Sequence, residues 1–127
     1  MSGITDLEEL IHAMRPEARD GEFVVVTTET PGLPAEAMVR EAEGTTLVLR
    51  REDADAAGLA YDFVASWITL TVHSSLDAVG LTAAFSTALA DAGIPCNVLA
   101  GYRHDHLLVP SDRRDDALEV LAALTEQ

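Results

Sequence analysis

The strongest constraint on the fold is a change of hydrophobic period in the second half of the chain. In the segment WITLTV, residues 67–72, apolar side chains alternate with threonines, which is typical of a strand with one face on a core. Residues 74–80 then form a loop, and from Leu81 to Ala92 the apolar spacing is helical, ended by a glycine and a proline. This order predicts a strand followed by the crossover helix that parallel strands require.

Two more strands and a helix follow this unit. Residues 96–102 and 106–109 are predicted as strands joined by a tight turn, and Ser111 or Asp112 is predicted to cap a last helix with leucines on its inner face. The second half is therefore expected to be βαββα. Such a unit lacks one edge strand of a split βαβ sandwich.

The first half of the chain is predicted to contain one helix and three strands. Thr5 followed three residues later by Glu8 predicts a capped amphipathic helix that ends before Pro16. The β-branched run EFVVVTTE, residues 22–29, predicts a strand. Residues 37–41 and 45–50 predict two more, joined by a tight turn at Glu43-Gly44. The first half is expected to be αβββ, with a strand to lend.

The alanine-rich, acidic segment at residues 52–63 shows no long apolar period and is interpreted as a connector. We place the domain boundary there, with one lobe at residues 1–60 and another at residues 61–127. Because the second half needs a strand from the first, we expect two interlocked lobes of the α+β class. Each has an antiparallel sheet with helices on one face.

Composition limits the function of the chain. The 127 residues include 22 acidic and 8 basic ones, and a net charge of -14 would repel nucleic acids and anionic membranes. The start lacks a basic region before an apolar run, and no segment approaches the length that spans a bilayer, so a cytoplasmic protein is expected. One cysteine, Cys96, cannot form an internal disulfide.

The segment GYRHDHLLVP, residues 101–110, holds two of the four histidines. In a strand His104 and His106 would face the same side, but zinc sites usually need at least three protein ligands, and the remaining histidines have no ligand-like spacing. A polar turn before a strand is the simpler interpretation. Asp105 is either a turn residue or a contact for a ligand cation. No nucleophile elbow or phosphate loop occurs, so we expect no enzyme and no cofactor.

The residues WITLTV, LDAVGLTAAFSTALADAGIPCNV, GYRHDHLLVP and DALEVLAAL resemble an ACT domain, a small-molecule sensing module. The segment EAEGTTLVL of the first half is similar to the same family. More narrowly, the chain resembles small stand-alone bacterial proteins with two ACT-like lobes, whose C-terminal lobe is related to that of arginine-sensing ACT proteins. The resemblance implies a ferredoxin-like ACT fold and a regulatory role. It also implies an amino acid bound at the loop after the first strand and at an interface between lobes or subunits, and commonly a homodimer.

Carried over residue by residue, the family's ligand loop falls on residues 76–81, and its acidic residue at the start of the third strand falls on Asp105. The ligand-binding residues expected on this basis are Asp77, Ala78, Val79, Gly80, Leu81, Asp105 and His106. The turn before the third strand departs from the related sensors, which have small hydroxyl residues where Ala100, Gly101, Arg103 and His104 stand here. The resemblance therefore does not identify the ligand.

The physical chemistry of the same loop agrees with a ligand role. The first N–H groups of a helix lack internal partners and, with the helix dipole, favour a carboxylate, while glycine permits close approach. The alternative is that Asp77 caps the helix and Gly80 supplies a turn. We expect a non-enzymatic amino-acid sensor. A metal-assisted hydrolase using residues 104–106 and a structural adaptor without a ligand remain the competing hypotheses.

Overall fold

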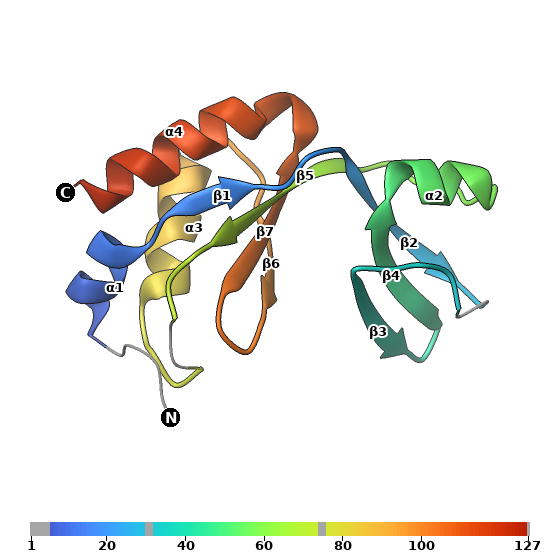
Figure 1. Cartoon of the computed structure of the whole chain (residues 1–127), viewed down its shortest axis with the longest axis horizontal. Coiled ribbons are helices and arrows are strands. Elements are labelled where there is room, and N and C mark those ends of the chain that lie inside the picture. The colour runs from blue at the N-terminus through green and yellow to red at the C-terminus, as the bar shows by residue number, and fades with distance from the viewer. Residues whose placement is uncertain (1–5, 30–31, 74–75, 127) are drawn as a thin grey trace. The chain divides into compact units, whose positions relative to one another are not determined.

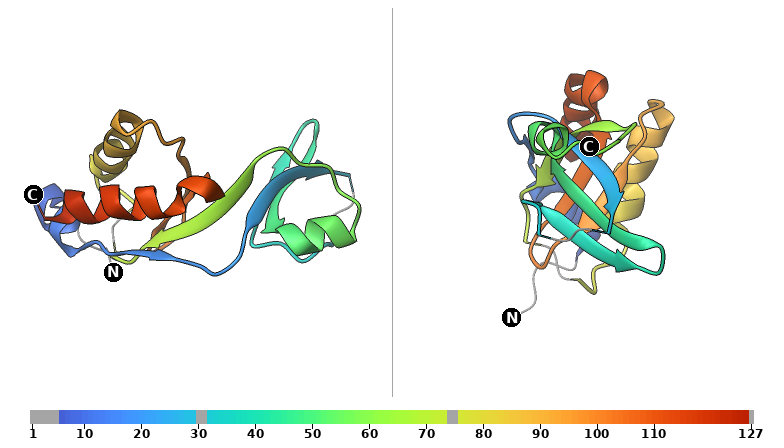
Figure 2. Two further views of the ribbon diagram at one scale, coloured as in Figure 1. Left: turned by 90° about the horizontal axis from the view of Figure 1, so that it is seen from above. Right: turned by 90° about the vertical axis from the view of Figure 1, so that its right-hand side faces the viewer.

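The computed structural model describes residues 6–29, 32–73 and 76–126 (Figures 1 and 2). These residues form two compact units. Unit 1 combines the residues up to Arg19 with those from Trp67 onward, and unit 2 comprises Asp20–Ser66. The domain boundary between residues 60 and 61 stays a prediction. Among the described residues, no helix is both long and apolar enough to cross a membrane.

Unit 1 is a four-stranded sheet covered by helices on one face (Figure 1). Its strands follow the order β1-β5-β7-β6. The elements of unit 1, with β5 beginning in unit 2, are α1 (Leu7–Ala13), β1 (Pro16–Ala18), β5 (Val64–Leu70), α3 (Leu81–Asp91), β6 (Asn97–Ala100), β7 (Asp105–Pro110), the short 3-10 helix η1 (Ser111–Arg113) and α4 (Arg114–Thr125). The predicted α+β class, with a βαββα order in the second half, is confirmed.

Strand β1 completes the sheet of unit 1. It pairs antiparallel with β5, with Pro16 opposite Leu70 and Ala18 opposite Ile68. Two flanking backbone bonds extend the pairing, from Arg19 N to the Trp67 oxygen and from Thr71 N to the Arg15 oxygen, both at 2.9 Å. The prediction that the first half lends a strand to the second is confirmed. The lent segment is a short strand that the sequence patterns did not indicate.

All three α-helices of unit 1 contribute to a single core against one face of this sheet (Figure 2). The alternation in β5 turns Ile68 and Leu70 toward the helices, as β7 does with Leu107 and Val109. The helical side chains buried there are Leu10, Leu81, Phe85, Leu89, Ala117 and Leu121. Helix α1 therefore belongs to the core of the C-terminal half, although it lies far from it in sequence.

Both predicted helix caps are wrong. Thr5 lies outside the described residues, and the N-cap of α1 is Asp6, whose carboxylate accepts a 2.9 Å hydrogen bond from Glu9 N. Neither Ser111 nor Asp112 caps α4, because both lie in η1 and the helix begins after Arg113 without a side-chain cap. A 3-10 turn often precedes an α-helix, and here it contains the two polar residues that were predicted to cap α4.

Unit 2 contains an antiparallel sheet whose strands follow the order β3-β4-β2-β5. Its own elements are β2 (Phe23–Thr28), β3 (Ala37–Glu41), β4 (Gly44–Arg50) and α2 (Arg51–Ala56). Strands β2 and β3 both run antiparallel to β4, so they are parallel to each other. Residues 29 and 32–36 of their connection contain no helix, so this crossover is shorter than is usual for parallel strands.

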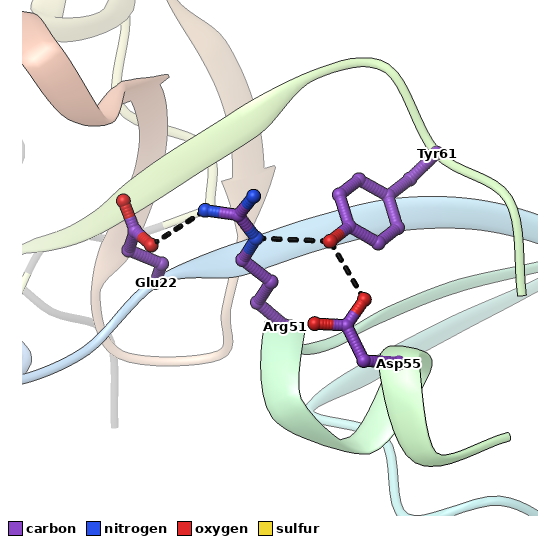
Figure 3. Close-up of polar contacts among 4 residues, drawn as sticks. All are labelled: Glu22, Arg51, Asp55 and Tyr61. Atoms are coloured by element: carbon purple, nitrogen blue, oxygen red, sulfur yellow. Dashed lines mark hydrogen bonds and ion pairs between the residues drawn. The ribbon is translucent and has the colours of Figure 1, made fainter. Parts of the chain in front are cut away.

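The connector predicted at residues 52–63 is wrong over its first part, where α2 stands. The six-residue helix buries only Ala54, so its apolar pattern is too short to detect. Arg51 begins the helix and contacts Glu22 at 3.0 Å and the Tyr61 hydroxyl at 2.9 Å (Figure 3). That hydroxyl donates to Asp55 at 2.7 Å, which ties the residues after α2 back to the helix.

Gly80 is a point of close contact between helices α1 and α3. It precedes α3 with a φ of +103°, a conformation that residues with a Cβ rarely adopt. A Cβ added there would also lie 2.9 Å from Leu7 Cδ2 on α1. Gly93 has a similar φ of +73° but nothing within 4 Å of an added Cβ. The two glycines therefore separate backbone strain from steric contact.

We predict that Gly80→Ala destabilises the protein more than Gly93→Ala does. Both substitutions place a Cβ at positive φ, which costs about 1–2 kcal/mol, and only Gly80→Ala also displaces the Leu7 side chain. Urea denaturation of the two variants measures the difference. In a Leu7→Ala background the additional penalty at Gly80 should shrink. Equal losses of stability for the two glycine variants would contradict the role of the contact.

Candidate functional site

The loop between β5 and α3, which contains the predicted ligand residues from Asp77 to Gly80, lies at one end of unit 1 (Figure 1). Asp77 lies in a turn and is exposed, and Val79 is 82% exposed. Gly80 is the N-cap of α3 and, as a glycine, has no side chain with which to cap the helix. The positive end of the helix dipole thus lies beside exposed backbone that a carboxylate could approach.

Two of the predicted loop residues have packing roles. The Leu81 side chain is 4% exposed and belongs to the core of unit 1, and Ala78 packs against that core. Their contribution to a ligand site would therefore come from backbone groups. The side chains that remain accessible on the loop are those of Leu76, Asp77 and Val79.

The turn between β6 and β7 lies at the same end of unit 1 as this loop (Figures 1 and 2). His104 Nδ1 is 3.0 Å from the carbonyl oxygen of Val72, which follows β5. Within the turn, Gly101 N donates to the His104 oxygen at 2.9 Å. A Cβ on Gly101 would lie 2.8 Å from that oxygen and 2.9 Å from His106 Nε2. The close approach explains why glycine occupies this position.

Asp105 and His106 lie on opposite faces of β7, because successive residues of a strand alternate. Asp105 shares its face with Leu107 and Val109, on the side covered by helices. Burial raises the pKa of its carboxyl group, and the neighbouring imidazole of His106 partly opposes that rise. A single ligand on the helical side could therefore contact the Asp105 side chain but not that of His106.

His106 belongs to an aromatic group on the face without helices. Its Nδ1 lies 3.3 Å from Trp67 Nε1 and 3.0 Å from the Thr69 hydroxyl, and its ring centroid is 5.4 Å from that of Trp67. The guanidinium carbon of Arg19 lies 4.2 Å above the Trp67 ring, in a cation–π contact. Burial, followed by the charges of Arg19 and His104, lowers the pKa of His106, and Asp105 opposes this.

This group was not predicted from the sequence, although part of its signal was present. The alternation that predicted β5 also places Trp67 and Thr69 together on the face opposite the core. The sequence did not indicate that β1 pairs with β5. Arg19 follows β1, and its position beside Trp67 depends on the pairing of β1 with β5.

The described residues provide no ligand set for a metal ion. Within residues 6–29, 32–73 and 76–126, no three His, Cys, Asp or Glu side chains are grouped as a metal site would need. His104 and His106 each have a protein partner at hydrogen-bonding distance. Cys96 is half-buried, and burial raises the pKa of its thiol to about 11, which disfavours the reactive thiolate.

Two family models cover nearly the whole chain, and both describe an ACT domain. One matches residues 2–66 and the other matches residues 63–123. A search of curated proteins found no match. The two matches agree with the resemblance inferred from the sequence, including that of the first half.

Solved structures show the same similarity. A protein of unknown function from Vibrio cholerae, described as a possible transport protein, is 46% identical with a TM-score of 0.86, over 98% of this chain and 99% of that one. A protein from Agrobacterium tumefaciens is 16% identical with a TM-score of 0.68, over 88% and 89%. The regulatory subunit of aspartate kinase from Thermus thermophilus is 8% identical with a TM-score of 0.64, over 90% and 97%. The chain belongs to the ACT domain family.

Proposed function

We propose that the chain is a non-enzymatic regulatory protein that binds an amino acid at the loop of residues 76–81. The observation that carries the proposal is the start of α3, where the N-cap position is a glycine, which has no side chain, beside an exposed loop. Membership of the ACT family and the fold shared with an aspartate kinase regulatory subunit support a regulatory role.

The chemistry at this end of unit 1 suits the two charges of an amino acid. The first N–H groups of α3 attract a carboxylate through hydrogen bonds and the helix dipole. Asp105, at the start of β7, offers a partly buried carboxylate to an ammonium group or a basic side chain. Ligand binding could shift an equilibrium between two conformations of the protein only by as much as the ligand's affinities for the two conformations differ.

Ligand binding should raise the melting temperature. At a concentration one hundred times its dissociation constant, the amino acid that binds should add about 2.7 kcal/mol of stability. Val79→Asp should weaken that ligand about tenfold or more, because it places a negative charge where we expect the ligand carboxylate. Ala60→Asp is the matched control, since Ala60 is also exposed but lies in the loop after α2 of unit 2.

A thermal-shift screen of the amino acids at millimolar concentration, followed by calorimetry of the variants, makes these measurements. If no amino acid shifts the melting temperature, the protein is better described as an adaptor without a ligand. If Val79→Asp and Ala60→Asp weaken binding equally, the ligand lies elsewhere.

Asp105 should act through its charge. Asp105→Asn keeps the shape of the side chain and removes the anion, so it should weaken an ammonium-bearing ligand by about 1.5–3 kcal/mol. Its effect on folding should be smaller and of the opposite sign, because burial already disfavours the charged form. Calorimetry of ligand binding and urea denaturation of the same variant separate the two effects. Unchanged affinity would make Asp105 a structural residue of the turn.

We also propose that the chain forms a homodimer through the edge of β3. This strand ends the order of its sheet, and no described strand pairs with its outer edge. It exposes Met38 at 52% and Val39 at 51%. Antiparallel self-pairing centred on Met38 would place Arg40 opposite Glu36 of the other copy twice, which joins opposite charges. Pairing would also cover an edge that otherwise favours aggregation.

Light scattering should therefore give twice the 13.5 kDa mass of the chain. Met38→Lys should shift the mass toward the monomer, because the symmetric register sets two lysines against each other. Met38→Leu is the control and should remain dimeric. A parent protein that is monomeric at every concentration would refute the dimer, and a dimer unaffected by Met38→Lys would place its interface elsewhere.

A further inference from the structure

The imidazoles of His104 and His106 are held in opposite protonation patterns. His104 Nδ1 faces the Val72 carbonyl oxygen at 3.0 Å, and a carbonyl only accepts, so this nitrogen carries a proton. His106 Nδ1 faces Trp67 Nε1 at 3.3 Å, and an indole N–H only donates, so this nitrogen carries none. His106 is therefore the neutral ring with its proton on Nε2.

The ring of His106 lies between β5 and the β6–β7 turn. Its unprotonated Nδ1 also accepts from the Thr69 hydroxyl at 3.0 Å, so two donors of β5 share this nitrogen. The opposite nitrogen, Nε2, lies beside Gly101, where an added Cβ would be 2.9 Å away. The contacts of one imidazole thus connect the strand that starts the βαββα unit with the turn of its hairpin.

We propose that His106 is a pH-sensitive latch between β7 and β5, which accepts a hydrogen bond from the Trp67 indole when neutral and loses this hydrogen bond when protonated. Protonation of Nδ1 would set an N–H against the indole N–H of Trp67, which only donates, whereas the Thr69 hydroxyl could turn and accept from it. His104 would respond differently, because its Nδ1 remains a donor to Val72 in the cationic form. The proposal is independent of ligand binding.

The surroundings of His106 set the direction of the response. Burial is the largest cause that lowers its pKa, and the charges of Arg19 and His104 act in the same sense. Asp105 on the same strand acts in the opposite sense and does not reverse the shift. The folded protein therefore binds this proton less readily than the unfolded chain does. Stability should fall as the pH drops below 6.5, the ordinary value, and level off below the folded pKa.

Trp67 gives a direct measurement of the latch, because it is the only tryptophan of the chain. Its fluorescence should change in a single transition with a midpoint below pH 6.5. His106→Asn offers an acceptor oxygen near the position of Nδ1 but cannot be protonated, so the transition should disappear. His104→Asn is the matched control, since its amide N–H replaces the donor to Val72, and the transition should persist. Circular dichroism over the same pH range checks that each variant stays folded.

The ring nitrogens of the parent protein provide a second test that needs no variant. Nitrogen NMR above the transition should find the proton of neutral His106 on Nε2, and a proton on the Nδ1 of His104. On acidification, the indole N–H signal of Trp67 should shift together with the His106 nitrogens. The latch would be refuted by a proton on His106 Nδ1 at neutral pH, or by a fluorescence transition that persists in His106→Asn or vanishes in His104→Asn.

Discussion

The pairing of β1 with β5 is the interaction on which unit 1 depends. Residues 67–127 alone supply three strands and leave one side of β5 open, with Ile68 and Leu70 facing the helices. Strand β1 covers that edge and brings α1 with it, which adds the fully buried Leu10 to the core. Because the backbone donors of a buried edge need partners, the N-terminal residues are an integral part of the C-terminal fold.

The long, periodic elements could be predicted from the sequence, and the short ones could not. Strand β5 and helix α3 carry enough apolar residues at a fixed spacing to reveal both type and position. Strand β1 has three residues and begins with a proline, and α2 buries a single alanine, so neither has a measurable period. Both contact partners distant in sequence, namely β5 for β1 and Glu22 for Arg51 of α2.

The candidate site was predictable where it follows the chain and not where it depends on three-dimensional contacts. The loop of residues 76–81 is continuous in sequence, so its position before α3 followed from the strand and helix patterns. Asp105 and His106 were grouped because they are adjacent, but strand geometry separates their side chains onto opposite faces. The contact of Gly80 with Leu7 and that of His106 with Trp67 join residues far apart in sequence. No local pattern encodes them.

The end of unit 1 that holds the loop of residues 76–81 exposes several apolar side chains. Four of the large hydrophobic residues that are exposed in the described chain lie in α1, the loop or the β6–β7 turn: Leu7, Leu76, Val79 and Tyr102. Segments of this kind open locally at a low free energy, whereas the core beneath them does not. A ligand or a proton that binds at this end would therefore need only slightly different affinities for two conformations of the end to shift the equilibrium between them. That property suits a regulatory domain, since the fold can remain intact while the site responds.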